Sequence, residues 1–182
     1  MYSKSDIGRS SNDRGRMFES LIEKGCQYYK IKGLAMIEKT PEPFRVKRKS
    51  NDGSFTGYFT GHAQPDFKGT LANGRSICFE AKVTSTKKLN QNVVTDNQAE
   101  CLNIHQELGA YVGVCCMVNK TAAFIPWHIW KDMKFIYGHK YMTEEDLKEF
   151  EVMTPGFIDF LKRSDDGYSW IGSEVNYSWN GR

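Results

Sequence analysis

A chain of 182 residues, of which 40% are hydrophobic, is long enough to bury one substantial core. No segment is long or polar enough to mark a linker, so we expect a single folded domain. The longest strongly apolar run, residues 110–118, is too short to span a bilayer, and the first residues lack an apolar signal core. These features exclude a membrane-spanning protein and predict a soluble, cytoplasmic one.

The net charge of +3 conceals an uneven distribution along the chain. Residues 1–90 contain 17 Lys and Arg against 9 Asp and Glu, a net charge of +8, whereas residues 91–182 carry a net charge of −5. Solvated surface lysines account for much of this excess but not for its clustering. A basic half of this kind predicts a face that binds phosphate groups, with an affinity that falls as the salt concentration rises.

Neither the cysteines nor the histidines follow the spacing of a metal site or a disulfide framework. The cysteines are odd in number, lie in apolar or amphipathic stretches and include no C-x-x-C pair: Cys26, Cys78, Cys101, Cys115 and Cys116. This pattern predicts reduced, buried thiols. The four histidines are scattered, which favours structural or surface roles for them.

Helical periodicity begins after a polar segment. Residues 1–12 are rich in serine and show no apolar period, which predicts a mobile arm. Residues 14–30 are predicted to form an amphipathic helix capped by Asp13. Glu19 follows the apolar Phe18 and lies at the edge of the buried stripe. A surface carboxylate and a site residue are therefore equally supported interpretations of Glu19.

A basic hairpin is predicted within residues 41–62, after a short strand over residues 34–37. Its arms are residues 44–50 and 54–60, joined by the turn signal Asn51-Asp52-Gly53. The first arm contains four cations in five residues: Arg45, Lys47, Arg48 and Lys49. A disordered basic loop is the alternative, and it would also add affinity for DNA through these cations.

The rest of the chain completes an α/β pattern. A polar loop with Lys87 and Lys88 precedes a helix predicted over residues 95–108, which has Gln98 in its first turn. Residues 111–118 and 122–125 are apolar enough to be two paired strands. The order of elements predicts a mixed central β-sheet flanked by helices. We assign no chemistry to residues 166–182.

The strongest chemical signal is a hairpin formed by residues 64–69 and 77–82. Alternate residues of a strand share a face, so Asp66 lies on one polar face and Glu80 lies with Lys82 on a face of the partner strand. The turn between the strands decides whether the two acids meet.

Two turns are compatible with the sequence. A two-residue Asn73-Gly74 turn would set Asp66 opposite Ala81 and separate the carboxylates onto different faces. A three-residue loop with Gly74 in the left-handed conformation would instead set Asp66 opposite Glu80, with Cβ atoms about 5 Å apart.

Two carboxylates at that distance repel each other unless a cation lies between them. Oxygen ligands without histidine or thiolate suit Mg²⁺, with Mn²⁺ as a substitute. Such an ion activates a water and neutralises charge on a phosphate, and Lys82 would position that water or stabilise the developing charge. Gln98 would reach the same water, unless it is an ordinary exposed glutamine of a first helical turn.

The tripeptide [DE]-x-K is a weak signal by itself. It occurs four times in this chain, starting at Asp66, Glu80, Asp132 and Asp146. Only the copy at Glu80 combines a strand context with an upstream Pro-Asp. From the residues alone, a nuclease site and a charged surface hairpin are equally supported.

An ordered set of segments over residues 14–165 is far more specific than any one motif. The segments are Arg14-Gly15-Arg16-Met17-Phe18-Glu19, Asp66-Phe67-Lys68-Gly69, Phe79-Glu80-Ala81-Lys82, Thr84, Gln98 and residues 157–161. In this set the chain resembles the RecU family of Holliday junction resolvases, which have the restriction-endonuclease-like fold of the PD-(D/E)xK nucleases.

The resemblance implies a role for each of five residues. Asp66 and Glu80 would be metal ligands, Lys82 the catalytic lysine, and Gln98 and Glu19 supporting residues. Members of the family are homodimers that cut four-way junctions with Mg²⁺.

The family also has a stalk, between its first two strands, that inserts at the junction centre, and residues 41–62 occupy that place. Gln64-Pro65 stands where threonines are frequent, and Asp96-Asn97 stands where a histidine is common. Roles of those family side chains are therefore not transferred.

We predict a homodimeric, Mg²⁺-dependent endonuclease that resolves branched DNA. Its nuclease domain is expected over residues 13–165, followed by a tail over residues 166–182. The expected DNA contacts are Arg14, Arg16, Arg45, Lys47, Arg48, Lys49, Lys87 and Lys88. The alternatives are a PD-(D/E)xK nuclease of other DNA specificity and a DNA-binding module without catalysis.

Overall fold

The computed structural model describes residues 4–41, 43–59 and 64–163. Its α-helices and 3₁₀ helices (η) are α1 (Lys4–Ile31), η1 (Gln91–Val93), α2 (Asp96–Glu107), α3 (Trp127–Lys131), α4 (Met133–Tyr137), α5 (Glu144–Leu147) and η2 (Lys148–Phe150). Its strands are β1 (Ala35–Lys39), β2 (Phe44–Lys49), β3 (Phe55–Phe59), β4 (Phe67–Leu71), β5 (Ser76–Thr84), β6 (Lys88–Asn90), β7 (Tyr111–Val118), β8 (Thr121–Pro126), β9 (Tyr141–Thr143), β10 (Val152–Met153) and β11 (Asp159–Arg163). The predicted tail over residues 166–182 lies outside the described residues.

A five-stranded sheet in the order β1-β4-β5-β7-β8 forms the centre of the molecule. Strands β5 and β7 are parallel, and the other neighbouring strands of this sheet are antiparallel. Helix α2 supplies the crossover that a parallel pair requires. The sheet is therefore mixed, as the order of elements predicted, and β5 is its central strand.

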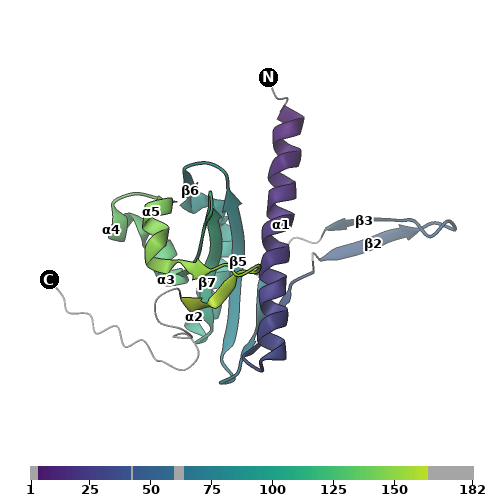
Figure 1. The fold of residues 1–182 in the computed structure, drawn as a ribbon. Coiled ribbons are helices and arrows are strands. Elements are labelled where there is room, and N and C mark those ends of the chain that lie inside the picture. The colour runs from purple at the N-terminus through teal and green to yellow at the C-terminus, as the bar shows by residue number, and fades with distance from the viewer. Residues whose placement is uncertain (1–3, 42, 60–63, 164–182) are drawn as a thin grey trace.

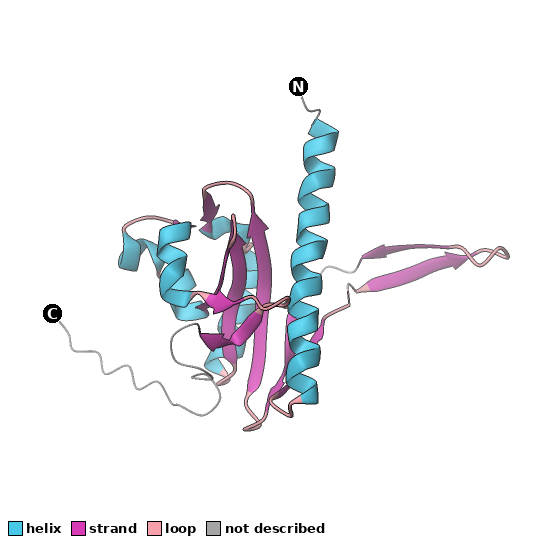
Figure 2. Cartoon of the chain, viewed as in Figure 1, coloured by secondary structure: helices cyan, strands magenta, loops and turns pink. Residues whose placement is uncertain are grey.

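Both faces of the sheet are covered by apolar layers. On one face Phe67 and Phe79 stack with ring centroids 5.1 Å apart, in the cluster that also contains Ile22 of α1. On the other face Trp127 and Trp130 of α3 are buried in a second cluster. Figure 2 shows α1 on one side of the sheet and the shorter helices on the other. The predicted architecture of a mixed sheet flanked by helices is confirmed.

Helix α1 begins earlier than the apolar pattern indicated. It starts at Lys4, so residues 4–12 are helical although their sequence shows no apolar period, while residues 1–3 are not described. The mobility of this segment stays a prediction. Figure 1 shows the N-terminal part of α1 extending past the sheet. Apolar periodicity marks only the part of a helix that packs. Once a helix exists, each added residue gains a hydrogen bond without a new nucleation cost.

The basic hairpin projects from the rest of the molecule as a stalk formed by β2 and β3 (Figure 1). The two strands pair from Phe44 opposite Phe59 to Lys49 opposite Phe55. This pairing confirms the predicted hairpin in preference to a disordered loop. Residues 60–63 of the predicted stalk lie outside the described residues.

A β-bulge decides how the stalk cations are distributed. Arg45 pairs with Tyr58 and Arg48 with Thr56, which makes Lys47 the extra residue of the bulge. Since Thr56 and Tyr58 are alternate residues of one strand, Arg45 and Arg48 share a face of the stalk. Strict alternation along the first strand would have placed them on opposite faces.

The other face of the stalk is aromatic. The rings of Phe44 and Phe55 meet with centroids 5.5 Å apart. They meet over Gly57, where an added Cβ would lie 2.5 Å from an atom of the Phe44 ring. The glycine therefore makes room for the ring contact.

The remaining general predictions concern thiols and membranes. All five cysteines are free, four are buried, and Cys101 is half-buried. Burial raises the pKa of the Cys116 thiol, which keeps it protonated and unreactive. Among the described residues, no helix has both the length and the apolar character needed to cross a bilayer.

Candidate active site

The register of β4 against β5 brings the two central acids together. Phe67 pairs with Phe79, and a loop of three residues closes the hairpin, with the Leu71 amide 2.8 Å from the Arg75 carbonyl oxygen. Gly74 has a φ of 83°, the left-handed conformation that glycine adopts without steric cost. Continuing this register by one residue sets Asp66 opposite Glu80, which confirms the second of the two possible turns.

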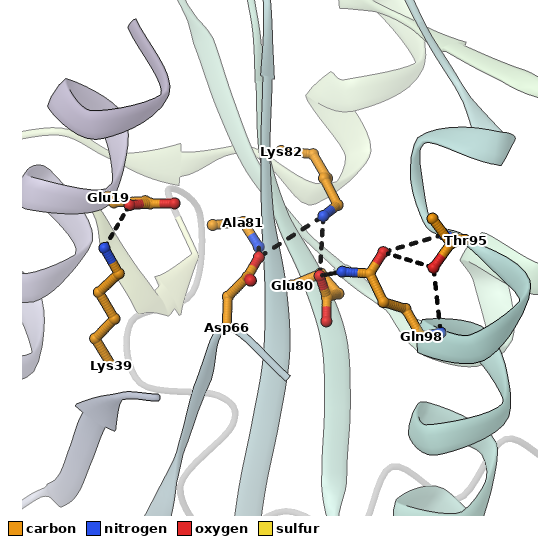
Figure 3. Close-up of polar contacts among 8 residues, drawn as sticks. All are labelled: Glu19, Lys39, Asp66, Glu80, Ala81, Lys82, Thr95 and Gln98. Carbon is orange, nitrogen blue, oxygen red and sulfur yellow. Dashed lines mark hydrogen bonds and ion pairs between the residues drawn. The ribbon is translucent and has the colours of Figure 1, made fainter. Parts of the chain in front are cut away.

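Glu80 is a buried carboxylate with an unequal environment at its two oxygens. Its side chain is 1% exposed. Oε2 accepts hydrogen bonds from Lys82 Nζ at 2.9 Å and from Gln98 Nε2 (Figure 3). Oε1 is buried and has no hydrogen-bond partner among the described residues. A buried carboxylate oxygen without a donor is a position for a cation.

Asp66 is half-buried and is held by the backbone of the neighbouring strand. Its Oδ2 accepts a hydrogen bond from the Ala81 amide at 2.9 Å. The same oxygen lies 3.7 Å from Lys82 Nζ. Lys82 therefore contacts both carboxylates and links them, as Figure 3 shows.

Gln98 is oriented by the start of helix α2. Thr95 is the N-cap, and its Oγ1 accepts from the Gln98 amide while Gln98 Oε1 accepts from the Thr95 amide at 3.0 Å. This capping box fixes Oε1 of the Gln98 side chain, so Nε2 of the same side chain is directed at Glu80. Of the two interpretations of Gln98, the structure supports the one in which it contacts the site. The T-x-x-Q spacing was the sequence signal for this orientation.

The pKa of Glu80 is raised from 4.5 to about 7, first by burial and also by the charge of Asp66. Lys82 lowers this pKa but does not offset the burial. The protein groups around Glu80 therefore supply too little positive charge to keep it fully ionised at neutral pH.

Glu19 lies on the side of Asp66 away from Glu80 and faces Lys39 of β1 (Figure 3). Glu19 Oε2 is 2.6 Å from Lys39 Nζ, and its side chain is 27% exposed. The hydrogen bond to Glu19 raises the pKa of Lys39, and the charges of Glu23 and Asp66 act in the same direction. Lys39 is thus a cation close to the site that the sequence reasoning missed, because the predicted strand ended two residues before it.

The predicted DNA contacts fall on three separate parts of the molecule. The cations of β2 are exposed on the stalk, and Lys87 and Lys88 are exposed at the end of β5 and the start of β6. On α1, Arg14 is half-buried, whereas Arg16 is exposed and forms an ion pair with Asp13. The structure does not gather these cations into one cluster.

The donor set of Asp66 and Glu80 fits a hard divalent cation. Both are carboxylates, and Glu80 Oε1 is a buried oxygen with no partner in the described part of the chain. Mg²⁺ needs only one or two carboxylates where waters and substrate phosphates complete its ligands. Residues 4–41, 43–59 and 64–163 contain no group of three or more His, Cys, Asp or Glu arranged for a metal. Because of their oxygen donors, Asp66 and Glu80 are the candidate metal site.

The sequence comparisons agree on one family. The sequence profile of RecU, described as Recombination protein U, matches residues 13–163. A Holliday junction resolvase RecU from Bacillus pumilus is 28% identical over 170 residues, which cover 85% of this chain and 82% of that protein. The protein of the same name from Streptococcus pneumoniae is 36% identical over 81 residues, 42% of this chain and 40% of that protein. The solved structure of Hjc, a Holliday junction resolvase from Archaeoglobus fulgidus, has a TM-score of 0.41 and 14% identity, covering 64% of this chain and 75% of that chain.

The raised pKa of Glu80 predicts a pH-dependent stability in protein free of divalent cations. Folding favours the protonated carboxyl, so this contribution is complete below about pH 4.5 and is lost as the pH rises through about 7. Across this pH range the unfolding free energy of the unmodified protein should fall by about 1 to 3 kcal/mol more than that of Glu80→Gln, whose side chain stays neutral. Urea unfolding in the presence of a chelator measures the difference.

The matched control is Glu145→Gln, because the Glu145 side chain is 79% exposed. It should retain the pH dependence of the unmodified protein. If Glu80→Gln and Glu145→Gln gave the same pH profile, Glu80 would not be the group whose burial opposes ionisation.

Proposed function

This chain belongs to the RecU family, and on that basis we propose that it is a metal-dependent endonuclease that resolves four-way DNA junctions. The observation that carries this proposal is the meeting of Asp66 and Glu80 across β4 and β5, with Lys82 in contact with both. Two carboxylates and one lysine at this spacing suit hydrolysis of a phosphodiester bond.

Asp66 and Glu80 are the residues that would hold Mg²⁺ or Mn²⁺. When bound, such an ion supplies positive charge to the phosphate and lowers the pKa of a water. Glu80 Oε1 has no hydrogen-bond partner among the described residues, and Asp66 Oδ2 lies 3.7 Å from Lys82 Nζ, farther than the 2.9 Å between Lys82 Nζ and Glu80 Oε2. The raised pKa of Glu80 is the physical reason to expect a cation there.

Each remaining side chain of the site has a separate task. Lys82 keeps a positive charge 2.9 Å from Glu80, in position to stabilise negative charge that develops on the phosphate. Gln98 donates to Glu80 and so holds the carboxylate in one rotamer, with Oε1 left available. The Ala81 amide does the same for Asp66. Together they set the geometry before substrate arrives.

Binding of branched DNA would use the stalk and the exposed cations. Arg45 and Arg48 lie on one face of a hairpin that projects from the sheet (Figure 1). Contacts of such cations with phosphates release counterions and make the affinity sensitive to salt. A homodimer is part of the proposal, because resolving a four-way junction takes two cuts and the described residues of one chain contain a single Asp66-Glu80-Lys82 cluster.

Cleavage of a four-way junction should require the cluster and Mg²⁺. We expect the unmodified chain to cut a junction at least tenfold faster than a linear duplex of the same sequence. Lys82→Ala should lower the single-turnover rate by about 100-fold or more, because it removes the charge next to the phosphate. Asp66→Asn should abolish cleavage while leaving binding of the junction.

The matched control is Lys134→Ala, since Asp132-Met133-Lys134 also fits the pattern [DE]-x-K and Lys134 is an exposed residue of α4. It should cut at the rate of the unmodified chain. Equal rates on junction and duplex would point to a nuclease of other specificity. Binding without cleavage in Mg²⁺ and Mn²⁺ would point to a DNA-binding module without catalysis.

The cap of α2 should affect catalysis beyond its effect on stability. Thr95→Ala removes the capping box that orients Gln98, so we expect a loss of about 1 kcal/mol in unfolding free energy and a slower cleavage step. Denaturant unfolding and single-turnover cleavage measure the two effects on the same preparation.

Thr143→Ala is a close control, because Thr143 forms the same kind of capping box with Asp146 at α5. It should lower stability by a similar amount and leave the cleavage rate unchanged. Equal loss of cleavage in both variants would mean that the cap acts only through global stability.

A further inference from the structure

A cavity of about 620 Å³ lies beside helix α2, between η1 and α3. This volume is in the range of sites that bind small organic groups. Its lining is unusually rich in amides and indoles: Asn90, Asn92, Asp96, Asn103, Trp127 and Trp130. The role proposed for the Asp66-Glu80 cluster uses none of these side chains.

The polar side chains at the rim of the cavity are accessible to a ligand. Asn90, Asn92 and Asp96 line the cavity and are exposed to solvent. Asn90 stands at the N-cap of η1, yet its side chain does not cap that helix. The indole nitrogen of Trp130 is buried and has no acceptor in the described part of the chain. A buried donor of this kind normally has a partner.

The walls of the cavity are fixed by hydrogen bonds between its elements. Gln91 Nε2 donates to the carbonyl oxygens of Trp130 and Lys131 at 2.8 and 2.9 Å. Trp127 Nε1 donates to Asn103 Oδ1 at 2.8 Å, which joins α3 to α2. The cavity is therefore formed before any ligand binds, and the Asn103 amide nitrogen remains a donor.

The cavity and the catalytic cluster share helix α2. Asp96, Ala99 and Asn103 line the cavity, while Gln98 of the same helix donates to Glu80. At 100° per residue the cavity face is turned away from Gln98, so about one helix diameter, roughly 10 Å, separates the two. The Asp66-Glu80 pair lies beyond Gln98, and a DNA strand advances about 3.4 Å per nucleotide in a duplex, so the cavity is about three or more nucleotides from the pair.

We propose that this cavity binds a nucleobase of the strand being cut, about three or more nucleotides from the scissile phosphate, and thereby sets the preference for cleavage site. This inference rests on the proposed junction-resolving function. Asparagine amides and a carboxylate present both donors and acceptors, which is the chemistry that reads the edge of a base. At an open branch point a base has lost a stacking neighbour, which lowers the cost of moving it out of the helix.

The surroundings favour a nucleobase over a peptide segment. Lys131 and Lys140 also line the cavity and would lie near the phosphates on either side of the bound base. Peptide sites of common type offer a free strand edge or an apolar groove. This cavity is instead bounded by helices and lined by indole rings and by side-chain amides that face solvent.

The first experiment is photocrosslinking of the full chain to a four-way junction that carries a halogenated pyrimidine at one position at a time. Asp66→Asn is used as the background so that binding is not followed by cutting. We expect crosslinks to the peptides that contain residues 90–92 or 127–131, from positions about three or more nucleotides from the cut. Crosslinks to other peptides only would overturn the proposal.

The second experiment maps cleavage sites on junctions of randomised sequence. Asn90→Ala combined with Asn92→Ala should flatten the sequence preference by about tenfold, while Asn97→Ala, an exposed residue of α2 outside the cavity, should not. Ala99→Leu, which fills part of the cavity, gives an independent variant with the same expected change. An unchanged distribution in both the Asn90/Asn92 double variant and Ala99→Leu would contradict the proposal. Absence of any cleavage would refute the function itself and leave the crosslinking to decide about the cavity.

Discussion

Phe67 stacks on Phe79 one residue away from the two acids, and this apolar pair holds the register on which the site depends. A shift of one residue would turn the side chains of one strand to the opposite face. The aromatic ring would then leave the core, and Asp66 would face Ala81 in place of Glu80. Burial of a phenylalanine contributes about 1.5 to 3 kcal/mol, so packing on one face of the sheet secures the chemistry on the other.

Without a bound cation, the positive charge at the site does not balance the two carboxylates. Glu80 is surrounded by apolar strands, and the donors Lys82 and Gln98 both approach the same oxygen. Burial therefore still dominates its pKa. A divalent cation bound by the pair would remove this imbalance. In the protein without the cation, burial of Glu80 lowers the stability of the fold, and the same burial creates the binding site. Lys39 and Glu19, on the other side of Asp66, compensate each other and leave that imbalance in place.

The sequence predicted the order of elements, the stalk and the family, because these follow from local periodicity and from a distinctive ordered set of motifs. The catalytic roles of Asp66, Glu80 and Lys82 stay a prediction. It left the register open, because Asn73-Gly74 suits two turns and only packing of the whole sheet selects one. Lys39 was missed because its position depends on pairing with a strand nearly thirty residues later. The shared face of Arg45 and Arg48 depends on a bulge that no sequence alternation shows.

Binding of Mn²⁺ to the chain without DNA tests the central claim most directly, since it needs no assumption about substrate. Titration calorimetry should show one class of site on each chain. Asp66→Asn and Glu80→Gln should each weaken it by about tenfold or more, whereas Asp132→Asn, from a tripeptide of the same letters outside the hairpin, should leave it unchanged. Equal affinity in Asp66→Asn and the unmodified chain would contradict the claim that the β4–β5 register builds a metal site.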